Sequence, residues 1–275
     1  MSASSSRPAR FHRYVALGDS FTEGVGDVDP LRPNGVRGWA DRVAEVLAAD
    51  AALHGEPFGY ANLAIRGRKM RGILDEQIEP ALALEPDLVS IYAGVNDILR
   101  PRGDIDAIMR DYRAALWRLR DAGITIALFT AFDPGTKGFF GPLRGRLAIY
   151  NEHVRELAEE TGSIILDSWR MRPERPETMW ADDRIHLNAI GHQYVAIKVL
   201  ETLGIPHELV ELVPEPRPLI SAAERRAANI EWLRRDAVPF VNRRLRGRSS
   251  GDDMDPRFAT YVVNPGSVAT ETVSY

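Results

Sequence analysis

Cysteine is absent from this chain of 275 residues, which excludes disulfides, thiolate metal sites and cysteine nucleophiles. Charge of one sign is not in excess either, since 35 Lys and Arg stand against 39 Asp and Glu. The resulting net charge of −4 argues against nucleic acid or another polyanion as a partner. No run approaches the roughly 20 apolar residues of a membrane span, and the Ser-rich start lacks the apolar core of a secretory signal. We therefore expect a cytoplasmic protein with no membrane span.

Short apolar runs alternate with stretches of helical periodicity over residues 13–205. Strands are predicted at 14–17, 60–65, 87–92, 124–130 and 163–166. Helices are predicted at 38–49, 73–84 with an interruption near Pro80, 105–120, 143–161 and 188–203, the last capped by Asn188. Such alternation favours an α/β fold, with a five-stranded parallel sheet covered by helices on both faces. Ligands bind such sheets at the carboxyl ends of the strands, where Ser20 and the loops after Tyr92 and Thr130 are expected.

The composition divides the chain into a flexible N-terminal segment (1–12), a main domain (13–205) and a C-terminal extension (206–275). The extension begins with a proline-rich linker. Ser221 and Glu224 then form a capping box at the start of a helix that reaches Ala237. We expect this helix to dock on the main domain, with Ile230 and Leu233 buried. A basic segment over residues 243–248 and a polar tail follow.

Two separated motifs supply residue types for nucleophilic catalysis. Ser20 follows the first predicted strand in Gly18-Asp19-Ser20, and Asp183 and His186 precede the last predicted helix. In a serine hydrolase the serine attacks, the histidine takes its proton and the aspartate fixes the tautomer of the histidine. Each motif also has an ordinary interpretation, as a tight turn and as a surface ion pair at a helix start.

Two further segments could supply hydrogen-bond donors to an oxyanion. Asn96 follows the third predicted strand in Gly94-Val95-Asn96-Asp97, and Gly67 lies in the loop after the second. A side-chain amide and a backbone N–H placed there could both point toward a developing negative charge. Taken separately, they could equally be an Asx-turn and a loop glycine.

Together these four segments, in this order, resemble the SGNH hydrolases, the GDSL-type lipases and esterases. The resemblance extends over roughly residues 13–203. It implies a flavodoxin-like α/β/α sandwich and a serine esterase without cofactor, acting on a small-molecule ester. It also implies a triad of Ser20, Asp183 and His186, with an oxyanion hole formed by Ser20, Gly67 and Asn96.

Other patterns are interpreted without a catalytic role. Residues 247–251 match the G-x-S-x-G nucleophile elbow, but no apolar strand precedes them and no histidine follows, so we interpret the match as coincidental. Asp182, His186 and His192 are a conceivable metal site, but positions six apart do not share a helix face, so we predict no metal. A basic cluster around Gly67 is interpreted as a solvated helix start. Its members are Arg66, Arg68, Lys69 and Arg71.

Aromatic residues near the predicted site are candidate walls for an acyl or alcohol group. They are Phe132, Phe139, Phe140 and Trp180. Because no long apolar lid separates the strands, we expect a preference for short acyl chains, from acetyl to butyryl. The family resemblance also leaves a carbohydrate deacetylase, a thioesterase or a lysophospholipase open. An alternative of another class is a binding protein on the same fold, whose basic segment docks a partner.

Overall fold

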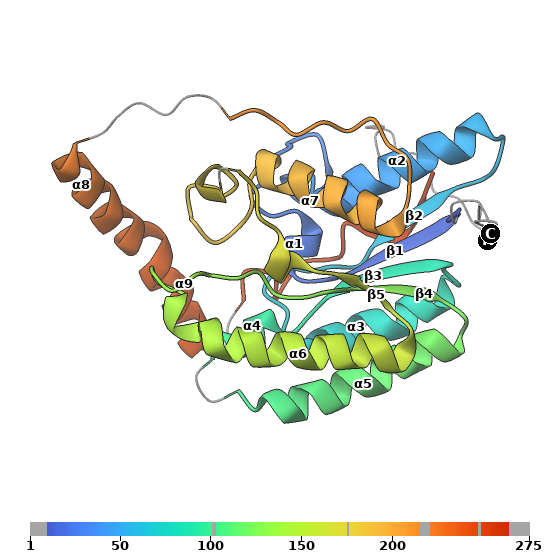
Figure 1. Ribbon diagram of the computed structural model, residues 1–275, viewed down its shortest axis with the longest axis horizontal. Helices are drawn as coiled ribbons and strands as arrows, with labels where there is room; N and C mark the ends of the chain where they lie inside the picture. Colours follow the sequence, from blue (N-terminus) through green and yellow to red (C-terminus); the bar gives the residue numbers. More distant parts are fainter. Residues whose placement is uncertain (1–9, 101–102, 175, 215–220, 247–248, 264–275) are drawn as a thin grey trace, which may run out of the picture.

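The computed structural model describes residues 10–100, 103–174, 176–214, 221–246 and 249–263. Its centre is a six-stranded sheet in the order β5-β4-β3-β1-β2-β6, between two layers of helices (Figure 1). The strands are β1 (Arg13–Gly18), β2 (Gly59–Asn62), β3 (Leu88–Tyr92), β4 (Thr125–Phe129), β5 (Ile164–Leu166) and β6 (Phe258–Val262). The helices α2 (Trp39–Leu53) and α7 (Ala189–Leu203) pack on one face. The other face is covered by α3 (Met70–Ala83), α5 (Ile105–Asp121) and α6 (Arg144–Thr161).

Shorter helices lie in the connections and in the C-terminal extension. They are α1 (Ser20–Glu23), η1 (Pro33–Gly35), α4 (Val95–Ile98), η2 (Gly141–Leu143), η3 (Ser168–Arg170), η4 (Pro176–Thr178), α8 (Ala222–Trp232), η5 (Leu233–Ala237) and α9 (Val238–Leu245). The turn η5 is π-helical and joins α8 to α9. Among the described helices, none is both long and apolar enough to cross a bilayer.

The predicted α/β fold is confirmed. Strands β1 to β5 run parallel to one another, and β1 lies between β2 and β3 with Tyr14 opposite both Tyr60 and Leu88. The predicted break near Pro80 is wrong, because α3 continues through it to Ala83. Proline removes a single backbone donor, and here it lies in the last turn of the helix.

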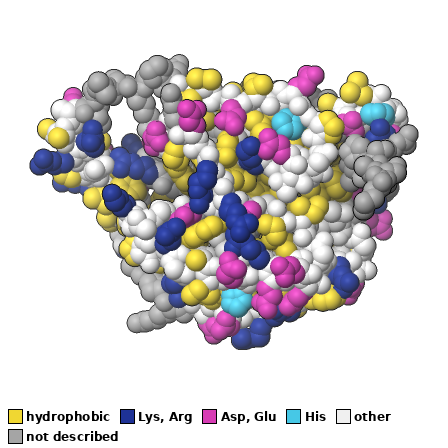
Figure 2. All heavy atoms as spheres, viewed as in Figure 1, with side chains coloured by type: hydrophobic (Ala, Val, Ile, Leu, Met, Phe, Trp, Pro, Cys, Tyr) yellow, Lys and Arg dark blue, Asp and Glu magenta, His cyan; other side chains and the backbone are white. Residues whose placement is uncertain are grey.

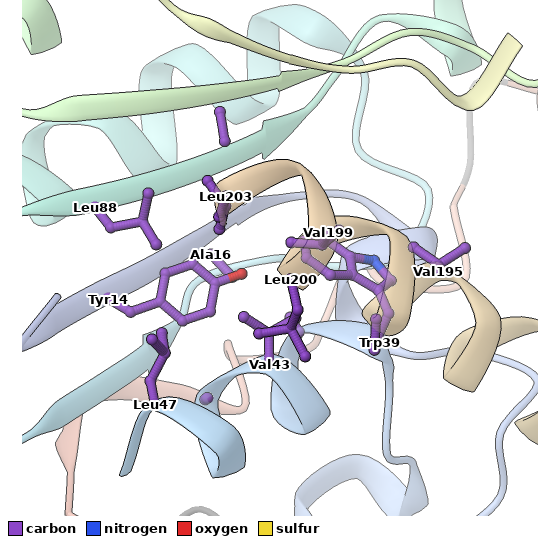
Figure 3. Close-up of a cluster of buried hydrophobic side chains, with 14 of the residues drawn as sticks. Tyr14, Ala16, Trp39, Val43, Leu47, Leu88, Val195, Val199, Leu200 and Leu203 are labelled. Carbon is purple, nitrogen blue, oxygen red and sulfur yellow. The ribbon is translucent and has the colours of Figure 1, made fainter. Parts of the chain in front are cut away.

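The burial of strand β1 explains why its sequence is a continuous apolar run. Its residues 14–18 are buried, because helices cover both faces of the sheet. On the α2–α7 face, Tyr14 and Ala16 meet Trp39 and Val43 from α2 and Leu200 from α7 (Figure 3). The hydroxyl of Tyr14 is buried with them and shares a hydrogen bond of 2.7 Å with Ser90 Oγ on β3, so the polar atom is satisfied.

The sixth strand corrects the sequence prediction, which assigned residues 258–262 to a polar tail and counted five strands. β6 pairs antiparallel to β2, with Tyr60 opposite Val262. Phe258, Tyr261 and Val262 are buried, and a Cβ on Gly59 would lie 2.8 Å from the ring of Tyr261. The free edge of β2 offers backbone donors and acceptors, so a short segment from the far end of the chain completes the sheet there.

The C-terminal helices also differ from the prediction. Ile230 and Leu233 were expected to be buried, yet they are 50% and 42% exposed, and every residue of 221–230 is exposed. Figure 2 shows hydrophobic and basic side chains together on this projecting part of the molecule, at the left. The helices instead make contact further on, through buried Ala237 and Phe240. The reason is geometric, because α8 projects beyond the sheet and lies beside the loops at the strand ends rather than on the core (Figure 1).

Candidate active site

Ser20 stands at the carboxyl end of the central strand β1, as predicted. Gly18 allows the close approach of β1 and β3 at this point, since a Cβ there would lie 2.6 Å from the carbonyl oxygen of Tyr92. Asp19 then caps α1 by accepting the backbone N–H of Phe21 at 3.1 Å. Ser20 is the first residue of that short helix and is partly exposed, so its hydroxyl is available at the edge of the sheet.

His186 joins Ser20 to Asp183 through both of its ring nitrogens. Nδ1 lies 2.6 Å from Asp183 Oδ2, and Nε2 lies 3.1 Å from Ser20 Oγ. With the Nδ1 proton donated to the carboxylate, Nε2 is left to accept the proton of the serine hydroxyl. The three side chains therefore have the connectivity that activates a serine nucleophile.

The turn that carries Asp183 and His186 is held by its own backbone. Asp183 Oδ1 accepts the N–H groups of Ile185 and His186 at 2.9 and 3.0 Å, and Arg184, which directly follows Asp183, adopts a positive φ of 54°. Burial raises the pKa of Asp183, but the hydrogen bonds from His186 and Ile185 and the electrostatic attraction of His186 together bring the pKa below its usual value. The carboxylate is thus ionised at neutral pH. Asp182, the neighbouring acid, is exposed and lines the cavity instead.

Asn96 and Gly67 lie in adjacent loops at the same edge of the sheet. Asn96 follows Gly94, and its Nδ2 donates to Asp19 Oδ2 at 2.8 Å and to the carbonyl of Arg68 at 3.0 Å. Gly67 directly precedes Arg68 and adopts a φ of +77°, which favours glycine. The four motifs singled out in the sequence therefore converge on one place.

A cavity of about 1060 Å³ opens beside Ser20 and His186. All four aromatic residues predicted as walls line it. The ring of Phe132 lies edge-on to Phe21 at 5.5 Å and to Trp180 at 6.3 Å. Charged side chains, among them Asp133, Lys137 and Arg172, lie among these rings, so the cavity offers both flat apolar surfaces and hydrogen-bonding groups.

The C-terminal helices supply walls that the sequence prediction missed. Trp232 at the end of α8 donates from Nε1 to the backbone carbonyl of Asp183 at 2.7 Å and packs edge-on against Phe139 at 5.9 Å. Phe240 on α9 meets Phe140 at 6.2 Å. Both residues line the cavity. The available signal was Trp232 itself, a large aromatic residue on a helix that was expected only to dock on the main domain.

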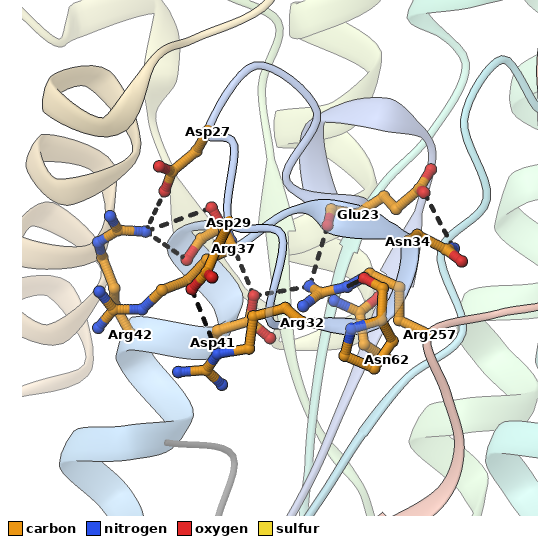
Figure 4. A network of polar contacts seen from close by, with 12 residues as sticks. Glu23, Asp27, Asp29, Arg32, Asn34, Arg37, Asp41, Arg42, Asn62 and Arg257 are labelled. Carbon is orange, nitrogen blue, oxygen red and sulfur yellow. Dashed lines mark hydrogen bonds and ion pairs between the residues drawn. The ribbon is translucent and has the colours of Figure 1, made fainter. Parts of the chain in front are cut away.

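A buried ionic network includes Glu23, Asp41 and Arg257 (Figure 4). Glu23, three residues after Ser20, is fully buried and accepts the backbone N–H of Arg66 at 2.7 Å and its guanidinium at 2.6 Å. The backbone carbonyl of Glu23 accepts from Arg257, which also pairs with Asp41 at 2.6 Å. The network thus connects α1, the loop that holds Gly67, and the segment before β6.

The basic cluster around Gly67 is therefore not simply a solvated helix start. Arg66 neutralises the buried carboxylate of Glu23, and Arg68 pairs with Glu76 at 2.7 Å and lies 3.7 Å from Asp252. Only Lys69 and Arg71 are exposed. The reason is that a buried carboxylate needs a cation beside it. Helix α1 brings the carboxylate of Glu23 to this loop, and Arg66 supplies the cation.

His192 lies away from the cavity. Its Nδ1 accepts the N–H of Trp39 at 3.2 Å, and its Nε2 lies 3.3 Å from the carbonyl of Val25. Burial lowers the pKa of His192 to about 3, so the ring is neutral and structural. In the part of the chain that the structure describes, no cluster of three or more His, Asp or Glu side chains is arranged to hold a metal ion.

Comparison with known proteins agrees with this geometry. The model of the GDSL-like lipase/acylhydrolase family matches residues 16–194. The chain belongs to that family. This membership confirms the resemblance seen in the four motifs, and it makes the chain an esterase of the GDSL type. The match ends within α7, so the whole C-terminal extension lies outside the family model.

Individual relatives support the same assignment. An acetylxylan esterase of Geobacillus stearothermophilus is 28% identical over 211 residues, which cover 70% of this chain and 94% of the relative. The structure of Axe2, an acetylxylan esterase from that organism, has a TM-score of 0.61 at 24% identity and covers 73% of this chain and 98% of its own. A putative GDSL-like lipase from Parabacteroides merdae has a TM-score of 0.56 at 22% identity, covering 72% and 99%. The solved structures show that the fold is shared.

Proposed function

We propose that this family member is a serine esterase that removes short acyl groups, above all acetyl, from a carbohydrate hydroxyl. The observation that carries the proposal is the chain of hydrogen bonds from Asp183 through His186 to Ser20 at the wall of the cavity. Sequence reasoning placed short-chain esters first and a carbohydrate deacetylase among the alternatives. The 28% identical acetylxylan esterase supports the deacetylase.

The proposed reaction begins with attack of Ser20 Oγ on the ester carbonyl while His186 Nε2 takes the hydroxyl proton. Asp183 stabilises the imidazolium that forms and holds the ring in place. The N–H groups of Ser20 and Gly67 would stabilise the oxyanion, and the side chain of Asn96 would join them by exchanging its hydrogen bond to the carbonyl of Arg68 for one to the oxyanion. His186 then returns the proton to the leaving alcohol, and a water molecule hydrolyses the acyl-enzyme by the same steps.

The shape of the cavity supports a substrate larger than a simple short ester. A volume of about 1060 Å³ far exceeds the space that an acetyl group needs, so most of the cavity would hold the alcohol part. Sugar rings pack their C–H faces on aromatic rings and hydrogen-bond around their rims. Trp180, Trp232 and Phe139 provide such rings, and Asp133 and Arg172 provide polar groups near them.

The test is hydrolysis of acetylated xylooligosaccharides alongside aryl esters of graded acyl length. We expect kcat/KM on the aryl esters to be highest at four carbons or fewer, and acetate to be released from the oligosaccharide. Ser20→Ala is the control, and residual activity above about 1% would remove Ser20 as the nucleophile, since triad losses usually reach ~10⁴ or more. A rate that climbs steadily to twelve carbons would favour the lysophospholipase alternative. No labelling of the wild-type protein by a fluorophosphonate would favour the binding protein.

A further inference from the structure

Ser249, in the coincidental G-x-S-x-G match, lies against the loop of the candidate oxyanion hole. Its Oγ donates to the backbone carbonyl of Arg66 at 3.0 Å and accepts the N–H of Gly251 at 3.1 Å. Its own N–H donates to Asp252 at 2.9 Å, which closes a small turn. The hydroxyl is therefore fixed in direction, and its proton points at the peptide that joins Arg66 to Gly67.

Residues 66–67 and residues 249–251 pack so closely that no side chain fits between them. A Cβ on Gly67 would lie 1.9 Å from Ser249 Oγ, and a Cβ on Gly251 would lie 2.3 Å from the carbonyl oxygen of Arg66. Contacts this short show that both glycines are required for the backbones to approach. Residues 249–251 thus form a surface that matches this peptide.

The peptide between Arg66 and Gly67 carries the N–H that the proposed mechanism directs at the oxyanion. The structure contains no cis peptide bond among the described residues, so the carbonyl of Arg66 and the N–H of Gly67 point in opposite directions. A bond that holds the carbonyl toward Ser249 therefore holds the N–H away from Ser249. Within the described part of the chain, that N–H donates to no backbone carbonyl.

Glycine makes this peptide easy to rotate unless it is held. Gly67 has a positive φ, and glycine occupies both signs of φ at little cost. On the other side of Arg66, Glu23 holds the backbone N–H and the guanidinium. Glu23 thus fixes residue 66 from the main domain, and Ser249 fixes the peptide that follows it from the C-terminal extension.

We propose that Ser249 is a positioning residue, whose hydroxyl holds the Arg66–Gly67 peptide so that the N–H of Gly67 faces the oxyanion. This inference rests on the proposed esterase function. It gives the C-terminal extension a part in catalysis, although the extension lies outside the family model. Ser249 does not touch the substrate in this role, and it acts only through the peptide.

The test compares Ser249→Ala with Ser250→Ala, an exposed neighbour that serves as the matched control. With p-nitrophenyl acetate, Ser249→Ala should lower kcat by about 10- to 100-fold, up to the usual effect of losing one oxyanion donor. KM should change less than twofold, because the oxyanion forms only in the transition state. Ser250→Ala should match the wild type, and Ser249→Thr, which keeps the hydroxyl, should recover kcat to within about threefold.

Several results would overturn the proposal. An unchanged kcat in Ser249→Ala, an equal loss in Ser250→Ala, or a Thr variant as slow as the Ala variant would each show that the hydroxyl does not position the peptide. A crystal structure of Ser249→Ala provides a readout independent of activity. We expect the Arg66–Gly67 peptide to rotate, and an unmoved peptide would refute the positioning role. Failure of the esterase function itself would appear instead as a wild type that hydrolyses no ester.

Discussion

Replacing Arg257 by Met should destabilise the fold strongly, although the residue lies far along the chain from the domain it supports. The side chains of Arg257 and Asp41 are both fully buried, and their closest atoms are 2.6 Å apart. Burial opposes the charge of Arg257, but Asp41 and nearby groups raise its pKa above the usual value, so Arg257 stays charged beside the carboxyl group of Asp41. Without Arg257, the buried carboxyl group of Asp41 would lose its cation and keep, among the described residues, only the N–H of Gly38 as a hydrogen-bond donor.

Breaking a buried ion pair by removing one partner typically costs about 3–5 kcal/mol. For a chain of this size that loss corresponds to a fall of roughly 6–20 °C in the melting temperature, at ~2–4 °C for each kcal/mol. Urea unfolding followed by circular dichroism gives the free energy directly, and a thermal scan gives the second value. Arg71→Ala, which removes an exposed partner of Asp75, is the control and should leave both values unchanged.

A second variant separates the charge from the packing. Asp41→Asn added to Arg257→Met removes the stranded charge but keeps an oxygen for the N–H of Gly38, so the double variant should be more stable than Arg257→Met alone. A loss below about 1 kcal/mol in Arg257→Met would refute the reasoning, since the pair would then contribute no more than a surface contact. A double variant no more stable than the single one would show that packing, not charge, sets the cost.

Three further predictions concern the site and the core. Asn96→Ala should lower kcat on aryl acetates by roughly 10²–10³, and a change in KM alone would assign Asn96 to ground-state binding. Trp232→Ala removes a cavity wall, so kcat/KM should fall more for an acetylated oligosaccharide than for p-nitrophenyl acetate. Equal losses on the two substrates would indicate that Trp232 acts through its hydrogen bond to the Asp183 carbonyl and not by contacting the oligosaccharide. Burial lowers the pKa of His192 from 6.5 to about 3 in the folded protein, so the unfolded chain binds this proton first as the pH falls. The free energy of unfolding should therefore decrease between pH 6.5 and 3, by up to about 1.4 kcal/mol per pH unit, and urea titrations of His192→Gln should show a flatter dependence.

The motifs of the candidate site could be predicted from the sequence because each depends on local structure. Ser20 follows a short apolar run that forms strand β1, and Asp183 reaches His186 within a single turn. Parallel strands end at one edge of a sheet, so the order of the motifs already placed Asn96 and Gly67 near Ser20. The periodicity likewise located β1 to β5 and the helices that cover them, because hydrophobic spacing reports directly on buried faces.

The C-terminal extension could not be read in this way. Phe258 and Tyr261 form a strand only because β2 leaves an open edge, and neither residue belongs to a long apolar run. Ile230 looked like part of a buried stripe, yet α8 projects past the core, and a helical pattern alone does not say which surface a helix meets. Arg66 and Arg68 looked solvated, since nothing nearby in sequence indicated the buried Glu23 or the distant Asp252.

The sequence by itself thus determined the fold and the candidate site residues Ser20, Asp183 and His186, because local structure and the shared edge of a parallel sheet specify both. Only the tertiary structure decided what supports and closes that site. Trp232 meets the carbonyl of Asp183 across 49 residues, and Ser249 meets the carbonyl of Arg66 across 183. Such contacts depend on where a whole segment packs, and that position follows from the combined burial of many side chains rather than from the residues that finally touch.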